Sequence, residues 1–287
     1  MVSAAALREA GFVESFEGSP DGYAIEREGE IVPVAIFGTL YAGDRVEVRL
    51  DGGKIKLRLA DRRSLMVTRA DSPFLIEDAG EVATVQGNIV RWLGGFLGGQ
   101  SNHVAGRSLV TRDADDKLRA PLLEPPGPTL VAGLRRLHLA WEGGQAPYQV
   151  RIIAVDTAAV VAAVEGIPLA HTQASVQLRP GGAYRVEIHD ARGAHLERTL
   201  SAVTDGPTPP PDLSGLPPGS SLESTLQGAW LASLSDGEWL LEGYQRIAEI
   251  ADSYRPAGLL RDALEGGERP PAPTPVSLQS DRNNGAE

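Results

Sequence analysis

Histidines and nearby carboxylates are the residues of this chain whose spacing could do chemistry. His189, Asp190 and His195 flank a turn over residues 190–193, so two imidazoles and a carboxylate could together bind a metal ion there. A solvated hairpin turn is the commoner use of such residues, and we favour it. His138 alternates with leucines in a predicted strand, which predicts a surface side chain and no ligand role.

Two other groups of carboxylates invite a functional reading. The segment Asp113-Ala-Asp-Asp116 resembles a calcium loop but lacks the central glycine and the closing glutamate, so we interpret it as an acidic turn. Asp44 and Asp61 could be imagined as an acid and base pair. Both lie at predicted strand ends, where aspartate is ordinary turn chemistry.

The common catalytic motifs are absent from the sequence. The chain has no cysteine, which excludes disulfides, thiolate zinc sites and cysteine nucleophiles. It contains no Gly-x-Ser-x-Gly, no Walker loop, no Gly-x-Gly-x-x-Gly and no His-Glu-x-x-His. We therefore predict a protein that is not an enzyme, with no catalytic residue, no cofactor and no bound metal.

The composition favours several small β-rich modules. The chain has 287 residues, more than one typical domain, and its 33 glycines and 21 prolines favour short elements joined by turns. We predict a mainly β protein with two β-domains and a short C-terminal helical segment. The predicted parts are a β-domain with an N-terminal extension (1–100), a linker (101–128), a β-sandwich (129–203), a Pro-rich linker (204–219), a small helical segment (220–267) and a disordered tail (268–287).

The first β-domain is predicted from alternating apolar residues between Ile31 and Ile76, separated by turn residues, as in a meander of antiparallel strands. Within it, Leu40–Val48, the following Asp-Gly-Gly turn, Lys54–Asp61 and Ser64–Val67 resemble the FecR-type β-domain. The resemblance covers about 45 residues. It implies a small β-fold without catalytic residues that senses a ligand or partner, and it transfers no specific site.

The second β-domain is predicted from five alternating strands after a first one near Leu130, which suits a β-sandwich. Trp141 closes the second strand, where such sandwiches bury a tryptophan. The segment Leu178-Arg-Pro-Gly-Gly-Ala-Tyr184-Arg-Val186 resembles the fibronectin type III pattern and, more broadly, an immunoglobulin-like module. The resemblance implies structural roles for Trp141 and Tyr184, and bacterial proteins that join a FecR domain to such a module are usually exported.

Helical signals follow the Pro-rich stretch. Ser220 with Glu223 is a capping-box signature for a helix to about residue 234, and Asp236 is predicted to cap a second helix. A third helix is predicted over Ala257–Leu264. In the second helix an apolar stripe includes Trp239 and Tyr244, which pack on the chain itself or bind a partner.

A second candidate docking patch lies in residues 85–100, where apolar side chains interleave with glycine pairs. The patch consists of Trp92, Leu93, Phe96 and Leu97. The alternative is that these side chains fold back onto the neighbouring β-core.

Charge narrows the class of partner. From Thr204 onward the chain has 13 acidic residues and 5 arginines, within a total net charge of −11. Such a surface repels nucleic acid and anionic membranes. With no apolar run long enough to cross a bilayer and no signal peptide at the start, we predict a cytoplasmic protein without a transmembrane segment, and the envelope or periplasm is the alternative.

We therefore predict a bacterial adaptor, sensor or regulatory protein that binds another protein through its β-domains and its acidic helical end. The alternative is an envelope-associated protein that binds carbohydrate or peptidoglycan, as the exported relatives suggest. The identity of the partner, the pathway and the oligomeric state do not follow from the sequence.

Overall fold

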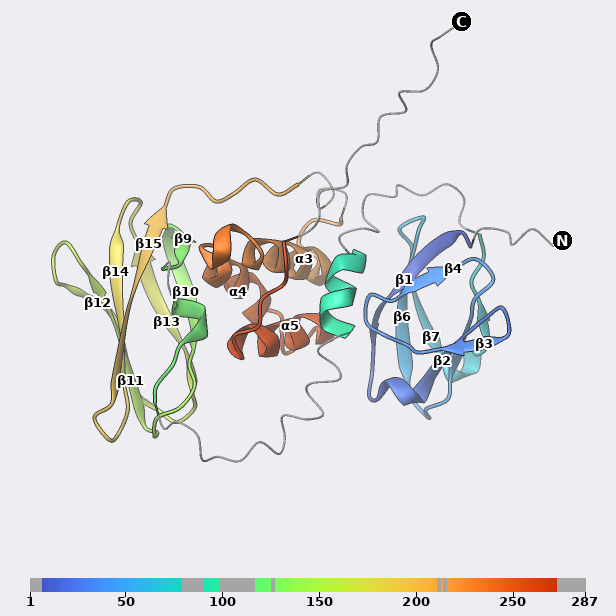
Figure 1. Cartoon of the computed structure of the whole chain (residues 1–287), viewed down its shortest axis with the longest axis horizontal. Helices are drawn as coiled ribbons and strands as arrows, with labels where there is room; N and C mark the ends of the chain where they lie inside the picture. Colours follow the sequence, from blue (N-terminus) through green and yellow to red (C-terminus); the bar gives the residue numbers. More distant parts are fainter. Residues whose placement is uncertain are drawn as a thin grey trace, which may run out of the picture.

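A computed structural model describes residues 7–78, 90–98, 117–124, 127–210, 213 and 216–272. The described parts form three units in a row: an N-terminal β-unit (residues 7–78), a central helical unit (residues 216–272) and a β-sandwich (residues 129–203) (Figure 1). The predicted mainly β fold with a short C-terminal helical segment is confirmed.

The N-terminal β-unit contains two four-stranded antiparallel sheets, ordered β4-β1-β6-β7 and β3-β2-β5-β8. Their side chains enclose one apolar core. The strands are β1 Glu9–Phe16, β2 Tyr23–Arg27, β3 Glu30–Val32, β4 Thr39–Tyr41, β5 Arg45–Val48, β6 Lys54–Leu59, β7 Ser64–Thr68 and β8 Phe74–Leu75.

The predicted meander is wrong in its pairing, although β5, β6 and β7 lie where it placed strands and β3 covers the start of its first one. β1, from the part of the chain that we took for an extension, lies between β4 and β6 and contributes the fully buried Val13. Because β1 takes the place beside β6, β5 pairs with β2 and β8 in the other sheet. The alternation that predicts a strand does not encode which neighbour it pairs with.

The sandwich has seven strands in two sheets, β10-β13 and β12-β11-β14-β15-β9. β9 joins β15 in parallel, and the other pairs are antiparallel. The sequence analysis missed β12, because its aliphatic run does not alternate with polar residues. The strands are β9 Thr129–Val131, β10 Gly133–Ala140, β11 Tyr148–Ala154, β12 Val160–Ile167, β13 His171–Leu178, β14 Ala183–His189 and β15 His195–Val203.

The helical unit consists of α3 Ser221–Ala232, α4 Leu240–Ala248 and α5 Arg255–Glu265. α3 and α4 cross closely: a Cβ atom on Gly243 would lie 2.3 Å from the carbonyl oxygen of Gly228. Only glycine permits this approach of the two backbones. Helical residues 90–98 lie between this unit and the N-terminal β-unit in Figure 1.

The helix ends partly agree with their predictions. The Ser220 side chain accepts a hydrogen bond from the Glu223 N–H at 3.2 Å, as a cap should, whereas the Glu223 carboxylate accepts one from Gly219 N–H. The predicted cap at Asp236 is wrong: this residue has a positive φ of 52°, and α4 begins at Leu240 without a side-chain cap. α5 begins at Arg255, earlier than predicted, because Pro256 is accommodated in its first turn.

The expected linkers contribute to the core. Residues 117–124 include the short 3-10 turn Pro121–Leu123, and Leu118, Leu122 and Leu123 are buried. This turn contacts α4, α5 and β15. Leu213 and Leu216 from the Pro-rich stretch are also buried. The segments that join the units therefore also help to pack them together.

Candidate functional site at the junction of the sandwich and the helical unit

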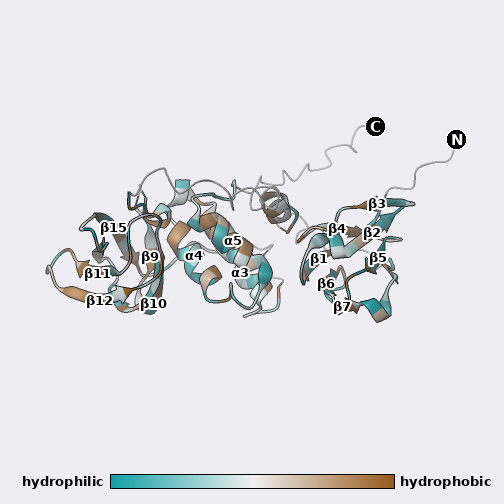
Figure 2. Ribbon diagram, turned by 90° about the horizontal axis from the view of Figure 1, so that it is seen from below, coloured by the Kyte–Doolittle hydropathy of each residue, from teal (hydrophilic) through white to brown (hydrophobic). Residues whose placement is uncertain are grey.

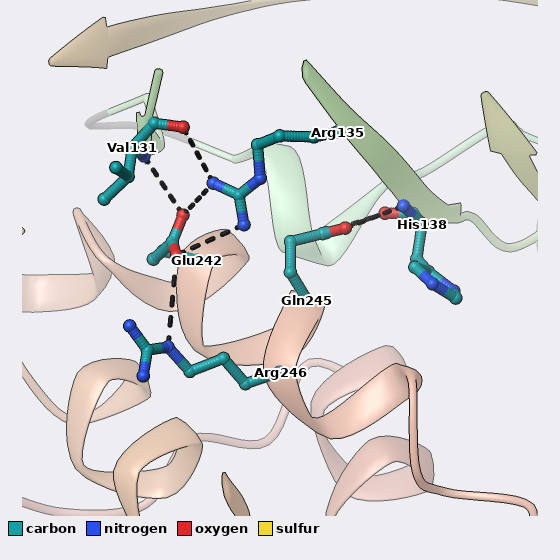
Figure 3. Close-up of polar contacts among 6 residues, drawn as sticks. All are labelled: Val131, Arg135, His138, Glu242, Gln245 and Arg246. Carbon is teal, nitrogen blue, oxygen red and sulfur yellow. Dashed lines mark hydrogen bonds and ion pairs between the residues drawn. The ribbon is translucent and has the colours of Figure 1, made fainter. Parts of the chain in front are cut away.

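The candidate site lies where α4 packs against β9 and β10 of the sandwich. Figure 3 shows that Glu242 and Gln245 reach from α4 toward Val131, Arg135 and His138 of the two strands. Glu242 and Gln245 are three residues apart, so they occupy the same face of the helix. Figure 2 shows α4 next to β9 and β10.

The first contact is an ion pair that crosses the junction. Arg135 donates hydrogen bonds from Nη1 to Glu242 Oε2 and from Nη2 to Glu242 Oε1, the latter at 3.2 Å. The Val131 N–H donates to Glu242 Oε2 at 3.1 Å, and the Val131 carbonyl accepts from Arg135 Nη1 at 2.9 Å (Figure 3). The side chains of Arg135 and Glu242 are 19% and 5% exposed, so removal of either would leave a charge largely shielded from water.

The second contact closes an open strand edge. The His138 N–H donates to Gln245 Oε1 at 2.7 Å, and Gln245 Nε2 donates to the His138 carbonyl at 2.9 Å. β10 pairs with β13 along one side, and these two groups point away from that pair. The amide of Gln245 thus takes the place of a neighbouring strand and satisfies both backbone groups.

The imidazole of His138 is buried in the same contact, so the predicted surface position of this residue is wrong. The helical unit covers the face of β10 that local alternation assigns to solvent. Burial lowers the pKa of His138 below its ordinary value of 6.5; Glu249 and Asp252 oppose this shift, and Arg136 adds to it. Its Nε2 has no hydrogen-bond partner among the described residues.

A pocket of about 220 Å³ opens beside the ion pair. Trp230 and Leu231 of α3 and two prolines of the 204–210 segment supply apolar walls, and Gln227 and Arg246 supply polar ones. Arg246 Nη1 donates to Gln227 Oε1 at 2.6 Å, and its Nε lies 4.0 Å from Glu242. The pocket combines apolar surface with a few fixed polar groups, and its volume lies below the roughly 300–1,000 Å³ of typical small-molecule sites.

The other end of the helical unit meets the N-terminal β-unit at a buried carboxylate. Glu14 of β1 is 1% exposed and lies 2.6 Å from Lys56 Nζ and 2.8 Å from Arg58 Nη2. Burial and the nearby Glu14 raise the pKa of the Tyr254 hydroxyl. Arg255 donates to the carbonyl of Phe16 at 3.0 Å and to that of Gly18, and its guanidinium lies 4.6 Å from the centre of the Phe16 ring.

The predicted docking patch in the 85–100 segment is divided by the structure. Leu93 and Leu97 are buried in the core, whereas Trp92 and Phe96 are half-buried. The Trp92 Nε1–H donates to the carbonyl of Pro271 at 2.8 Å. Partner binding by this patch stays a prediction, and its accessible part is limited to Trp92 and Phe96.

The two partner candidates of α4 also differ in exposure. Tyr244 is buried and its hydroxyl donates to Glu265 Oε1 at 2.6 Å. Burial and the negative charge of Glu265 raise the pKa of that hydroxyl. Trp239 is half-buried at the start of the helix, next to Gly206. Of this pair, Trp239 retains accessible surface for a partner.

Trp141 and Tyr184 lie in the core of the sandwich. Trp141 packs edge-on against Tyr148, with ring centroids 5.2 Å apart. The Tyr184 hydroxyl accepts a hydrogen bond from the Arg179 N–H at 2.6 Å. This bond ties the start of β14 to the turn before it.

The described part of the chain includes His189, Asp190 and His195, which the sequence analysis considered as metal ligands. Within the described residues no group of three or more histidine, cysteine, aspartate or glutamate side chains could hold an ion. Asp190 is buried, which opposes its ionisation, but three backbone N–H donors (Gln145, Ala194 and Arg192) lower its pKa overall. The imidazoles of His189 and His195 stack at 5.8 Å.

The remaining acidic candidates serve turns or lie outside the described residues. Asp44 is buried, pairs with Arg27 at 2.9 Å and accepts from the Tyr41 N–H. A backbone hydrogen bond from Arg63 is the main factor that lowers the pKa of Asp61. The segment 113–116 belongs to the part that the structure does not describe.

Sequence reasoning missed Arg135, Glu242, Gln245 and Glu14. In α4, Glu242, Gln245 and Arg246 form the polar side of an amphipathic helix, which sequence reasoning assigns to solvent. The sequence therefore carries no local signal that this side of α4 faces the sandwich. No such signal marks Glu14 either, because its position in β1 reads as ordinary alternation.

No family model, curated protein or solved structure matches the chain. The resemblances to the FecR-type and fibronectin type III domains therefore stay predictions. In the part of the chain that is described, no helix is long and apolar enough to cross a membrane.

Proposed function

We propose that this protein is a non-enzymatic adaptor of bacterial type, in which the helical unit holds two β-units in a fixed relation for binding to another protein. The observation that carries this proposal is that side chains of the helical unit bond to both neighbours, from buried positions at the sandwich and from a partly exposed one at the N-terminal β-unit. Glu242 and Gln245 bond to the sandwich, and Arg255 bonds to the N-terminal β-unit. A connector built this way keeps binding surfaces at a set distance.

The junctions revise the role of the acidic helical end. Its inner faces are used by contacts within the chain, so a partner meets its outer face. The exposed acidic side chains of the unit include Glu249, Asp252 and Asp262, of which Asp252 is 93% exposed in its side chain. We therefore propose a partner with a basic surface, whose association is accelerated by electrostatic attraction and slowed by salt.

The strand order of the sandwich supports an immunoglobulin-like or fibronectin type III module. A two-stranded sheet, β10-β13, faces a larger sheet in which β11 and β14 are central. Antiparallel sandwiches of this kind present loops and free edges to partners. The FecR-type character of the N-terminal β-unit, the cytoplasmic location and the sensing role are parts of the same proposal.

The experiment starts with chemical cross-linking and affinity capture from the native host, followed by purification of the captured partner. The full-length chain is then titrated with that partner at two salt concentrations. Charge reversal of Asp252 and Asp262 to lysine is expected to slow association about tenfold. Thr199→Lys, on the outer face of the sandwich, is the control and should leave association unchanged.

Three results would overturn the proposal. The first is a captured partner that does not bind the purified chain. The second is binding that is insensitive both to the charge reversal and to salt. The third is sedimentation of the chain with isolated peptidoglycan without any protein partner, which would favour the envelope-associated, glycan-binding alternative.

A further inference from the structure

The outermost strand of the larger sandwich sheet, β12, has a free edge. The sheet order places β12 at one end, paired only with β11 among the described strands. Figure 1 shows β12 at the extremity of the molecule, on the side away from the helical unit. Its apolar colouring is plain in Figure 2.

The backbone of this edge is directed outward at Ala163. Val155 N–H donates to the Ala183 carbonyl of β14, so by alternation the backbone groups of Arg151 also face β14. Arg151 lies opposite Ala163 in the β11–β12 pair. Ala163 therefore points its N–H and C=O toward the open side, where they can pair with another strand.

The usual protection against such pairing is weak on β12. Exposed edges are commonly blocked by lysine, proline, inward charges, β-bulges or a covering segment. β12 has one charged residue, Glu165, and its exposed positions include Val160 and Ala163. Register shifts lie on both sides of Ala162–Val164, but these three residues pair regularly with β11. The edge of β10 provides the contrast, because Gln245 covers it at His138.

We propose that β12 pairs with β12 of a second copy of this chain, antiparallel, about a two-fold axis at Ala163. This register places Ala163 opposite itself, Ala162 opposite Val164, and Val161 opposite Glu165. No two like charges face each other, and small aliphatic side chains meet along the centre. An antiparallel strand pair is its own complement, which is the requirement of a two-fold interface.

Charge favours a second copy at this end of the molecule. Residues 129–203 contain seven arginines and six acidic residues, so two sandwiches approach without net repulsion. The acidic excess of the chain is concentrated after Thr204, and the helical unit lies on the side of the sandwich away from β12 (Figure 1). Val155, 53% exposed in the turn before β12, adds apolar surface at the end of the edge.

The test is sedimentation equilibrium of the full-length chain from about 1 µM to about 1 mM, the range of weak to moderate association. We expect a monomer–dimer equilibrium. Ala163→Lys brings two lysines face to face and should weaken the dimer at least tenfold. An equimolar mixture of Ala163→Lys and Ala163→Glu should restore a dimer, because opposite charges then lie directly across from each other.

Thr199→Lys, which adds the same charge to β15 on the same face of the sheet, is the matched control and should dimerise as the unaltered chain does. Circular dichroism of each variant checks that the fold is retained. A chain that remains monomeric at about 1 mM overturns the proposal. So does a dimer that Ala163→Lys leaves intact, because that dimer uses another surface.

Discussion

The two junctions of the helical unit use charge differently. At the sandwich, the two members of the ion pair come from different units, Arg135 from β10 and Glu242 from α4. At the N-terminal β-unit, Glu14, Lys56 and Arg58 pair within that unit, and α5 reaches mainly for backbone carbonyls. The sandwich junction therefore depends on one particular pair of charged side chains. At the N-terminal β-unit, another donor of similar length could bond to the same backbone carbonyls.

Removal of the crossing carboxylate should have the largest effect. Glu242→Ala leaves the Arg135 guanidinium and the Val131 N–H without their acceptor in a largely buried site. We expect a loss of about 3 kcal/mol in the free energy of unfolding, measured by urea titration with tryptophan fluorescence. The control Asp252→Ala breaks an exposed pair with Arg261 and should cost less than about 1 kcal/mol. Equal losses of stability in Glu242→Ala and Asp252→Ala would show that the buried ion pair contributes no more than the exposed one.

Loss of the edge-closing amide should come next. Gln245→Ala strands the N–H and C=O of His138, for an expected cost of about 2 kcal/mol and faster hydrogen exchange of the His138 amide. Gln245→Glu keeps the acceptor and loses the donor, so the buried His138 carbonyl, left without a donor, should still destabilise the contact. Unchanged exchange in both variants would show that another group closes this edge.

A smaller effect is expected at the other junction. Arg255→Ala removes donors from the carbonyls of Phe16 and Gly18 and a cation over the Phe16 ring. Water can serve these carbonyls in its place, so the expected cost is about 1 kcal/mol. Arg255→Lys should recover part of it through the retained charge. A cost as large as that of Glu242→Ala would remove the difference between the junctions.

The smallest effect is a pH dependence at the sandwich junction. Because burial depresses the pKa of His138 in the folded chain, protonation favours the state in which His138 is exposed. The stability of the junction should be complete above the ordinary pKa of 6.5 and should fall as the pH decreases from there toward the lower folded pKa. Unfolding titrations between pH 7.5 and 5.5 test this, and His138→Gln should flatten the curve in that window. A curve unchanged by the substitution would assign the dependence to other groups.

Local signals predicted much of the secondary structure. The cap at Ser220, the helices that follow it and the alternating strands of both β-units could be placed because each depends on neighbours a few residues away. β12 was missed because both of its faces are aliphatic. The helix cap predicted at Asp236 was wrong because residues of several types can begin a helix. The candidate site was missed because its members are more than 100 residues apart.

The sequence by itself determined the β-rich composition, the turns, the helix periodicity and the concentration of acid after Thr204. Only the tertiary structure decided that β1 enters the centre of a sheet, that α4 covers His138 and that β12 is left open. The physical reason is range. Backbone propensity and capping act within a turn or two, whereas burial, ion pairing and edge closure depend on which distant surfaces the folded chain brings together.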